Sequence, residues 1–242
     1  MRVDVWSDVV CPWCFIGLSN LEQAVAGFAH GDEVEVVLHS YELDPDAPQQ
    51  DDRSLNELLA KKYGATTEQI EAQQHRITQL GAEAGIDFQF DRAKRANTFE
   101  SHRLLHLARE RGVQLELKHR LGRAYFTDGE LLADHDVLRK AAADVGLDPA
   151  EVDEVLSSDR YAAEVRQDEE AGREIGISGV PFFVIDGRLG LSGAQPPETL
   201  QQVLERAWPE RVTGRITMVD DATGPADAPA DADACGPEGC EV

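Results

Sequence analysis

Two cysteines near the start of the chain have the type and spacing that thiol-disulfide chemistry needs. Cys11 and Cys14 enclose Pro12 and Trp13, so the thiols are three residues apart. In a helix this spacing places both sulfurs on one face, where the second can attack a mixed disulfide formed on the first. Backbone N–H groups at a helix N-terminus stabilise the attacking thiolate. We therefore expect Cys11 to be the exposed, attacking thiol and Cys14 to be the buried, resolving thiol.

The elements around this pair favour redox chemistry over the alternatives, a buried cysteine pair or half of a zinc site. Residues 2–8 alternate as a strand does, and the β-branched residues 34–38 predict a second strand. Residues 12–28 between them predict a helix with Pro12 at its first position, where the missing N–H costs nothing. The β-α-β unit implies two parallel strands, and a C-x-x-C motif within such a unit is typical of redox proteins.

The later elements predict an α/β domain that a helical segment interrupts. Roughly a hundred residues of helical pattern follow the β-α-β unit, with capping boxes at Ser54–Glu57 and Thr66–Gln69. A helix over 158–175, two strands joined by an Asp-Gly turn at 186–187, and a last helix over 197–208 complete the α-β-β-α half. The expected parts are residues 1–44 with 158–208, an inserted helical domain at 45–157, and an acidic flexible tail at 209–242.

The tail contains a second cysteine pair. After Val219 it has seven acidic residues and no lysine or arginine, so it cannot bury enough apolar surface to fold alone. Cys235 and Cys240 flank a flexible Gly-Pro-Glu-Gly turn. Three interpretations are open: a second redox pair that exchanges with Cys11 and Cys14, a four-cysteine zinc site, or an idle disulfide. We favour the redox pair, because a zinc site would occupy both thiols of the first helix.

Four segments in the same order resemble the cytoplasmic DsbA-like oxidoreductases of the FrnE type. They are Ser7–Gly17, Asn97–His106, Gly176–Val184 and Ser192–Gln195, and the resemblance extends over about residues 2 to 207. It implies a thioredoxin-like fold with a helical domain inserted between its β-α-β and β-β-α halves, and the strand order 2-1-3-4. It also implies disulfide exchange with protein or small-molecule substrates and no cofactor.

The resemblance further implies which residues surround the cysteines. Val180-Pro181 matches the family's cis-proline, which would leave the Val180 backbone free to pair with an extended substrate. It also places Asn97 and His102 at the active-site cleft, so the expected substrate-binding residues are Pro12, Trp13, Asn97, His102, Val180 and Pro181. His102 and His106 have metal-ligand spacing but lack the His-Glu-x-x-His pattern, so no metal site is expected.

Charge and hydropathy narrow the partners. A net charge of −23 argues against nucleic acid and anionic membranes, both of which would repel the surface. The sequence has neither a run of about 18 apolar residues nor a signal-peptide pattern, so we expect a cytoplasmic protein. Glutathione or a thioredoxin-type protein is the expected reductant. The rival functions are a glutathione-dependent isomerase or transferase of the kappa type, and a zinc-stabilised binding module.

Overall fold

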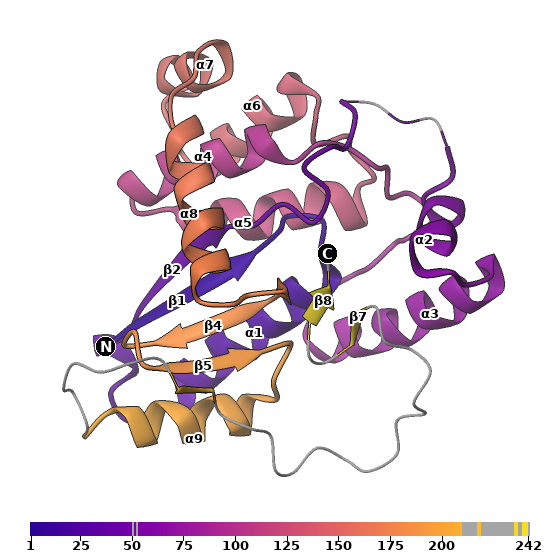
Figure 1. The fold of residues 1–242 in the computed structure, drawn as a ribbon. Helices are drawn as coiled ribbons and strands as arrows, with labels where there is room; N and C mark the ends of the chain where they lie inside the picture. Colours follow the sequence, from indigo (N-terminus) through magenta and orange to yellow (C-terminus); the bar gives the residue numbers. More distant parts are fainter. Residues whose placement is uncertain (50, 52, 210–216, 219–234, 237–238, 242) are drawn as a thin grey trace.

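The computed structural model describes residues 1–49, 51, 53–209, 217–218, 235–236 and 239–241 (Figure 1). Its main sheet has the order β2-β1-β4-β5-β6. The strands are β1 (Arg2–Ser7), β2 (Glu35–Ser40), β4 (Phe182–Ile185), β5 (Leu189–Ser192) and β6 (Thr217–Met218). β1 and β2 are parallel, and β4 runs antiparallel to both β1 and β5. The predicted strand order is therefore confirmed, while β6, which lies parallel to β5, was not predicted.

Helices cover both faces of this sheet (Figure 1). α1 (Pro12–Gly27) and α9 (Pro197–Ala207) pack together on one face, where Val5 of β1 and Phe183 of β4 are fully buried. α8 (Ala162–Glu174) packs on the other face against β2, and its Gly172 lies close to the Trp6 ring. Alternate side chains of β1 therefore enter two different cores, as the period of two in a strand requires.

The inserted segment is helical, as predicted. After the 3₁₀ turn η1 (Gly31–Glu33) and β2, it contains α2 (Leu55–Tyr63), α3 (Thr67–Glu83), α4 (Phe99–Glu110), α5 (Gln114–Gly122), the π-helical turn η2 (Arg123–Thr127), α6 (His135–Asp144) and α7 (Pro149–Ser157). The capping box at the start of α3 is confirmed, because Thr66 and Gln69 exchange side-chain-to-backbone hydrogen bonds. The box expected at α2 does not form: Ser54 is the N-cap, but its exposed side chain makes no capping bond.

One hydrophobic cluster extends from the redox helix into the inserted helices. Cys14 and Phe15 of α1 belong to the same cluster as Leu104 of α4 and Leu121 of α5. Phe15 also packs edge-on against Phe126 of η2, with ring centroids 5.6 Å apart. The predicted boundaries at residues 45 and 157 therefore do not separate two independent cores.

Gly122 allows this close packing, and its replacement is expected to destabilise the protein. A Cβ at Gly122 would lie 2.2 Å from the Phe15 ring, which is buried and cannot swing away. We expect Gly122→Ala to lower the free energy of unfolding by about 1–3 kcal/mol, the usual cost of overpacking a core. Denaturant unfolding measures this change. Gly27→Ala is the matched control, because a Cβ there meets nothing closer than 3.4 Å; equal effects of the two substitutions would contradict the packing argument.

A second, small sheet joins the chain terminus to the segment before Pro181. Its order is β3 (Gly179–Val180), β8 (Gly239–Glu241) and β7 (Cys235–Gly236), and all its pairs are antiparallel. The predicted flexible tail did not include these strands. The backbone groups at the edge of β3 can pair with an extended segment, and β8 is that segment. In the described part of the chain, no helix has the length and apolarity needed to cross a membrane.

Candidate active site

Cys11 and Cys14 lie where β1 leads into α1. Cys11 is the N-cap residue of α1 in an extended conformation, with Pro12 following at the first helical position. The Cys14 backbone N–H donates to the Cys11 carbonyl over 3.1 Å, which closes the first turn. The two thiols are not joined to each other by a disulfide. The predicted helix position of the pair is therefore found, with Cys11 at the positive end of the helix dipole.

The expected exposure of Cys11 is wrong. Cys11 is 0% exposed and Cys14 1% exposed, so both sulfurs are buried. The physical reason lies in residues far away in sequence. Cys11 Sγ is 3.6 Å from the Val180 carbonyl oxygen, and strand β8 pairs with β3 at Val180 and approaches α1. Strand β8 thus lies near α1, in a position that the sequence did not predict.

The Val180–Pro181 peptide bond is cis, as predicted. Val180 is fully buried and its carbonyl faces Cys11, so this segment does lie at the redox site. Gly17 of α1 allows the approach, since a Cβ there would be 3.0 Å from Pro181 Cγ. The strand edge at Val180 is paired with Cys240 of β8 rather than open.

A buried carboxylate lies directly before the redox loop. Asp8 is 0% exposed; its Oδ1 accepts from the Val9 N–H at 2.7 Å and lies 3.1 Å from His102 Nε2, while its Oδ2 accepts from the Leu43 N–H at 2.8 Å. Burial by itself would raise the pKa of Asp8. The hydrogen bonds and the charges of His102 and Lys118 outweigh burial, so the pKa is lowered and the carboxylate stays ionised.

A buried lysine from the inserted segment completes the site. Lys118 of α5 is 0% exposed, and its Nζ donates to the Asp8 carbonyl at 2.7 Å and to Ser7 Oγ at 3.1 Å. The ammonium also lies 5.0 Å from the centre of the Phe15 ring. Burial lowers the pKa of Lys118, while the charges of Cys14, Asp8 and Cys11 favour its charged form. Lys118 is therefore a buried cation within electrostatic reach of Cys14.

The environment of Cys14 holds its proton firmly. Burial raises the pKa of Cys14 well above that of an ordinary thiol, and the neighbouring Cys11 raises it further. Lys118 and the Asp8 backbone N–H act in the opposite direction. The site therefore contains a shielded thiol with one buried cation that favours its thiolate.

The remaining expected site residues have different positions. Trp13 is buried in the core, and Pro12 is half-buried at the wall of a cavity. His102 is 1% exposed and lies beside Asp8, because α4 packs against the redox loop. The Asn97 side chain donates to the Pro45 and Ala47 carbonyls and accepts from the Phe99 N–H. His102 and Asn97 thus hold loops through hydrogen bonds, and a place for them at the substrate cleft stays a prediction.

Sequence reasoning missed Asp8 and Lys118. A signal for Lys118 was present, because Gln114, Leu117, Lys118 and Leu121 have the spacing of one buried helix face. A lysine on such a face is almost never fully buried without a partner. Asp8 was visible only as an acid in an otherwise apolar segment, and nothing in the sequence indicated its neighbours.

His39, Asp4 and Asp168 form a second polar network, from which we predict that the free energy of unfolding depends on pH. His39 Nε2 is 2.7 Å from Asp4 Oδ1 and its Nδ1 is 2.6 Å from Asp168 Oδ1, with the Trp6 ring stacked at 4.4 Å. Burial opposes protonation of this imidazole, but the two carboxylates outweigh burial and raise the pKa of His39. The stabilisation is therefore complete below the unfolded pKa of about 6.5 and is lost as the pH rises through the folded pKa.

Replacement of His39 tests this network. We expect His39→Gln to lower the free energy of unfolding by about 2–3 kcal/mol at pH 6, since hydrogen bonds to charged groups are lost, and by less at pH 9. Unfolding of both proteins in denaturant across this pH range measures the difference. His119→Gln, at an exposed pair with Glu22, is the control. A difference that stays constant with pH would show that the His39 charge does not matter.

Comparisons with known proteins agree with this geometry. The family model described as DSBA-like thioredoxin domain matches residues 2–205. The crystal structure of a probable DsbA oxidoreductase from Streptomyces coelicolor is 40% identical, has a TM-score of 0.84, and covers 100% of this chain and 99% of its own. An uncharacterized protein of Bacillus subtilis, YwbO, is 29% identical over 84% of this chain and 96% of its own length.

A more distant structure shares the fold. The cytosolic disulfide reductase DsbM from Pseudomonas aeruginosa is 20% identical, with a TM-score of 0.62 over 87% of this chain and 100% of its own. A structure of DsbM with GSH matches with a TM-score of 0.59 over 86% of this chain and 100% of its own.

Proposed function

The chain belongs to the DSBA-like thioredoxin domain family, and from this premise we propose that Cys11 is the attacking thiolate and Cys14 the resolving thiol of this thiol-disulfide oxidoreductase. In the reducing direction, Cys11 attacks a substrate disulfide and one substrate thiolate leaves. Cys14 then loses its proton and attacks Cys11 Sγ, which releases the second thiolate and leaves a Cys11–Cys14 disulfide. In the oxidising direction the same steps run in reverse.

The observation that carries this proposal is the asymmetry of the two cysteines. Cys11 caps α1 and its Sγ lies 3.6 Å from the Val180 carbonyl oxygen, whereas Cys14 lies in the first turn of α1, where Lys118 opposes the effect of burial on its pKa. A helix N-terminus favours the first thiolate. The buried ammonium favours the second thiolate at the moment of resolution. Pro12, Val180 and Pro181 remain our proposed substrate-binding residues, and an extended substrate pairs with the Val180 backbone in place of β8.

We further propose that the enzyme works in the cytoplasm on protein or small-molecule thiols and disulfides, with glutathione or a thioredoxin-type protein as reductant. The glutathione complex of the similarly folded DsbM supports glutathione as a candidate. The net charge of −23 disfavours nucleic acid and membrane partners. Residues 1–44 with 158–208 form the proposed thioredoxin-like part, and 45–157 the proposed helical part.

Redox equilibration tests the proposed function and its rivals. The purified chain is equilibrated in glutathione buffers, and the fraction of Cys11–Cys14 disulfide is measured by alkylation and mass spectrometry. A Cys11–Cys14 reduction potential within the cytosolic range of roughly −220 to −320 mV supports a reductase or isomerase function, and a far more oxidising potential supports an oxidase function. A pair that never oxidises refutes the proposal. Stoichiometric zinc would favour the binding module, and isomerase activity in Cys14→Ser protein would favour the kappa-type rival.

The pairing of β8 supports our proposal that Cys235 and Cys240 form a second redox pair. Cys240 lies opposite Val180, whose carbonyl contacts Cys11 Sγ, and Cys235 lies opposite Cys240. Directly opposed residues of an antiparallel pair have Cα atoms about 4.5–5.5 Å apart, a separation that permits a disulfide. This backbone register supports an intramolecular exchange between the tail pair and the first pair.

Removal of the tail thiols is expected to slow recycling of the first pair. Cys235→Ser/Cys240→Ser protein keeps the tail but loses the exchange, so reoxidation of Cys11 and Cys14 should slow by roughly tenfold, given the millimolar effective concentration of a tethered thiol. Stopped-flow tryptophan fluorescence follows this step. Truncation after residue 220 keeps β6 and removes β7 and β8, and it separates strand occupancy of Val180 from thiol exchange. Equal reoxidation rates in all three proteins would mean that the tail thiols are idle.

A further inference from the structure

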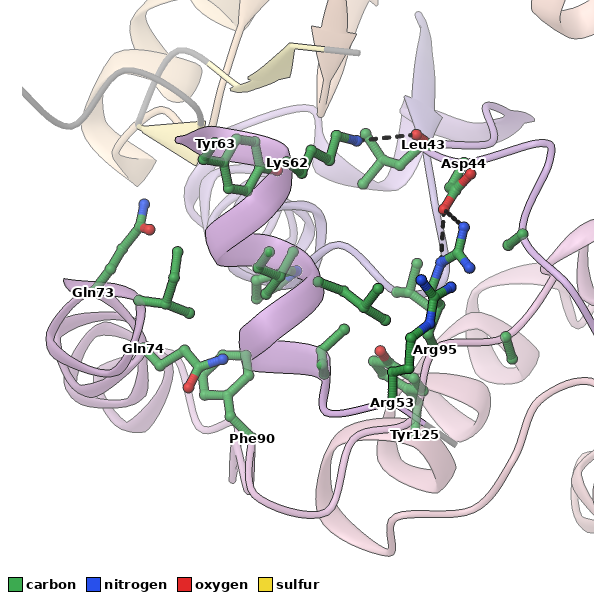
Figure 2. Close-up of a pocket in the computed structure, with 18 of the residues that line it drawn as sticks. Leu43, Asp44, Arg53, Lys62, Tyr63, Gln73, Gln74, Phe90, Arg95 and Tyr125 are labelled. Atoms are coloured by element: carbon green, nitrogen blue, oxygen red, sulfur yellow. Dashed lines mark hydrogen bonds and ion pairs between the residues drawn. The ribbon is translucent and has the colours of Figure 1, made fainter. Parts of the chain in front are cut away.

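A large cavity opens beside the redox helix. It has a volume of about 460 Å³ and lies between α2, α3, η2 and the loops that follow β2 and precede α4 (Figure 2). This volume falls within the range of about 300–1,000 Å³ that is usual for small-molecule sites. Most of the wall is apolar, and Leu58, Ile77, Phe90 and Tyr125 are among the residues that form it.

Helix α2 forms one wall and leaves its leucines incompletely packed. Leu55, Leu58 and Leu59 all line the cavity and are only half-buried. Protein interiors are normally filled to crystal-like density, so apolar side chains around a void of this size lack contacts that a ligand could supply. The cavity therefore offers apolar contact area to a compact group.

One end of the cavity is lined by the residues next to Cys11. Val10 and Pro12, the residues on either side of Cys11, both line it. Tyr63, at the last position of α2, also lines it. Burial raises the pKa of Tyr63 to about 12, and the charge of Cys11 contributes, so this phenol lies within electrostatic reach of the sulfur. A molecule in the cavity can thus extend toward Cys11.

The charge of the lining is opposite to that of the chain as a whole. The chain has 46 acidic residues and 23 lysines and arginines. Among the described residues, four cations but one acid line the cavity: Arg53, Lys61, Lys62, Arg95 and Asp44. This local excess of positive charge stands out in so acidic a protein and favours an anion.

Most of the arginine charge is neutralised, and the lysine charge is not. Arg95 pairs with Asp44 at 2.6 Å (Figure 2). Arg95 also pairs with Asp51 at 2.8 Å, and Arg53 pairs with Asp51 at 2.7 Å. Lys61 and Lys62 have no acidic partner in the part of the chain that the structure describes. Lys62 Nζ donates to the Leu43 carbonyl at 3.3 Å, beside Tyr63 (Figure 2). The unpaired positive charge therefore lies at the Tyr63 end of α2.

We propose that this cavity binds the aryl or branched alkyl group of a low-molecular-weight thiol or disulfide that carries a carboxylate. The leucines of α2 contact the apolar group, Lys61 and Lys62 attract the carboxylate, and the sulfur lies toward Cys11. The redox step rests on the function proposed above, whereas the binding step does not. An enclosed cavity selects compact apolar groups, whereas a flat peptide-binding surface would not.

The exchange balances without a further reactant. The Cys11 thiolate attacks one sulfur of an aryl disulfide, a Cys11–aryl disulfide forms, and one aryl thiolate leaves. The Cys14 thiolate then attacks Cys11 Sγ, a Cys11–Cys14 bond forms, and the second aryl thiolate leaves. Two electrons pass from the cysteine pair to the substrate, and the two cysteine protons pass to the aryl thiolates or to water.

Binding is tested first in the full chain with Cys11→Ser, where no exchange can occur. The probe is 8-anilinonaphthalene-1-sulfonate, which is aromatic and anionic, and N-phenyl-1-naphthylamine is its neutral counterpart. We expect one sulfonate probe per chain and roughly tenfold weaker binding of the neutral probe. Truncation after residue 220 should leave this binding unchanged. If truncation alone creates the binding, the tail is the natural occupant and the proposal is overturned.

Matched substitutions on α2 locate the bound probe. Leu58→Trp fills the cavity and is expected to weaken binding at least roughly tenfold, whereas Glu57→Trp, exposed on the same helix and outside the lining, should change it less than about twofold. Lys61→Gln/Lys62→Gln should remove the preference for the anionic probe, and the exposed pair Lys94→Gln/Lys140→Gln should keep it. Equal effects of Leu58→Trp and Glu57→Trp, or of the two lysine double substitutions, overturn the proposal. The lysine comparison alone is sufficient if Leu58→Trp protein folds poorly.

A single-turnover reaction of the reduced chain tests the substrate class. We compare 3,3′-dithiodibenzoate with its neutral amide, each corrected for its reaction with dithiothreitol. The acid should react roughly tenfold faster, and the ratio should fall toward one in Lys61→Gln/Lys62→Gln protein. Turnover of hydroxyethyl disulfide with no probe binding would overturn the cavity proposal and keep the proposed function. Probe binding with no turnover of any disulfide would refute the proposed function and keep the binding site.

Discussion

Replacement of Cys11 by serine is expected to abolish disulfide exchange, with a loss of at least about a thousandfold in rate. A serine hydroxyl is not ionised near neutral pH and cannot form a disulfide, so no mixed disulfide can begin. Insulin reduction and exchange with a fluorescent peptide disulfide measure the loss. Because Cys11 caps α1 without a side-chain hydrogen bond, the substitution should leave the fold intact.

Replacement of Cys14 gives the complementary result. Cys14→Ser should still attack the substrate but should accumulate the mixed disulfide on Cys11, because no second thiol resolves it. Mass spectrometry after acid quenching identifies the trapped cysteine. Cys14→Ser in the Cys235→Ser/Cys240→Ser background is the control, because it lacks the tail thiols that could resolve the mixed disulfide in place of Cys14. Trapping on Cys14 in Cys11→Ser protein would reverse the assigned roles.

Removal of the buried Lys118 charge is expected to slow the resolving step by about ten- to a hundredfold. A charge a few ångströms away in a buried site contributes on the order of 1.4–3 kcal/mol to the stability of a thiolate, and each 1.36 kcal/mol is a factor of ten. Lys118 favours the Cys14 thiolate and so opposes the effect of burial on the pKa of that thiol. Lys118→Met keeps the length of the side chain and should therefore affect resolution more than the first attack.

The pH dependence distinguishes this effect from simple damage. Burial raises the pKa of Cys14, so the resolving rate should increase with pH in the natural protein. In Lys118→Met protein the same increase should move to higher pH, because the cation that opposes burial is gone. Rapid-quench alkylation separates the two steps. Lys140→Met, at an exposed pair with Glu130, is the control. A uniform slowing of both steps at every pH would refute the role of Lys118.

Local signals in the sequence predicted the scaffold of the site correctly. Pro12 after Cys11 indicates a helix start, β-branched residues indicate β2, and the Asp186-Gly187 turn indicates the β4–β5 hairpin, and each of these elements is present. The family resemblance predicted the cis bond at Pro181 and the strand order. These features depend on short stretches of chain or on motifs that the family shares, so they could be identified without a structure.

Long-range packing determined the environment of the redox pair. Lys118 and His102 both contact Asp8, although they lie 110 and 94 residues away from it in the sequence. They reach Asp8 because α5 and α4 pack against the loop around it. Cys11 is buried with its Sγ beside the Val180 carbonyl of β3, which lies 169 residues away along the chain. Charge and burial at a site are set by neighbours in space.

The sequence by itself therefore determined which residues carry the chemistry of this protein. The C-x-x-C motif, its place between a strand and a helix, and the Val180-Pro181 segment are all written in consecutive residues. Only the tertiary structure decided which groups surround each thiol, which buried cation lies in electrostatic reach of Cys14, and what lies beside Pro12. Charge and burial depend on desolvation and on Coulomb interactions between groups that are close in space. Consecutive residues in the sequence do not show which groups will be close in space.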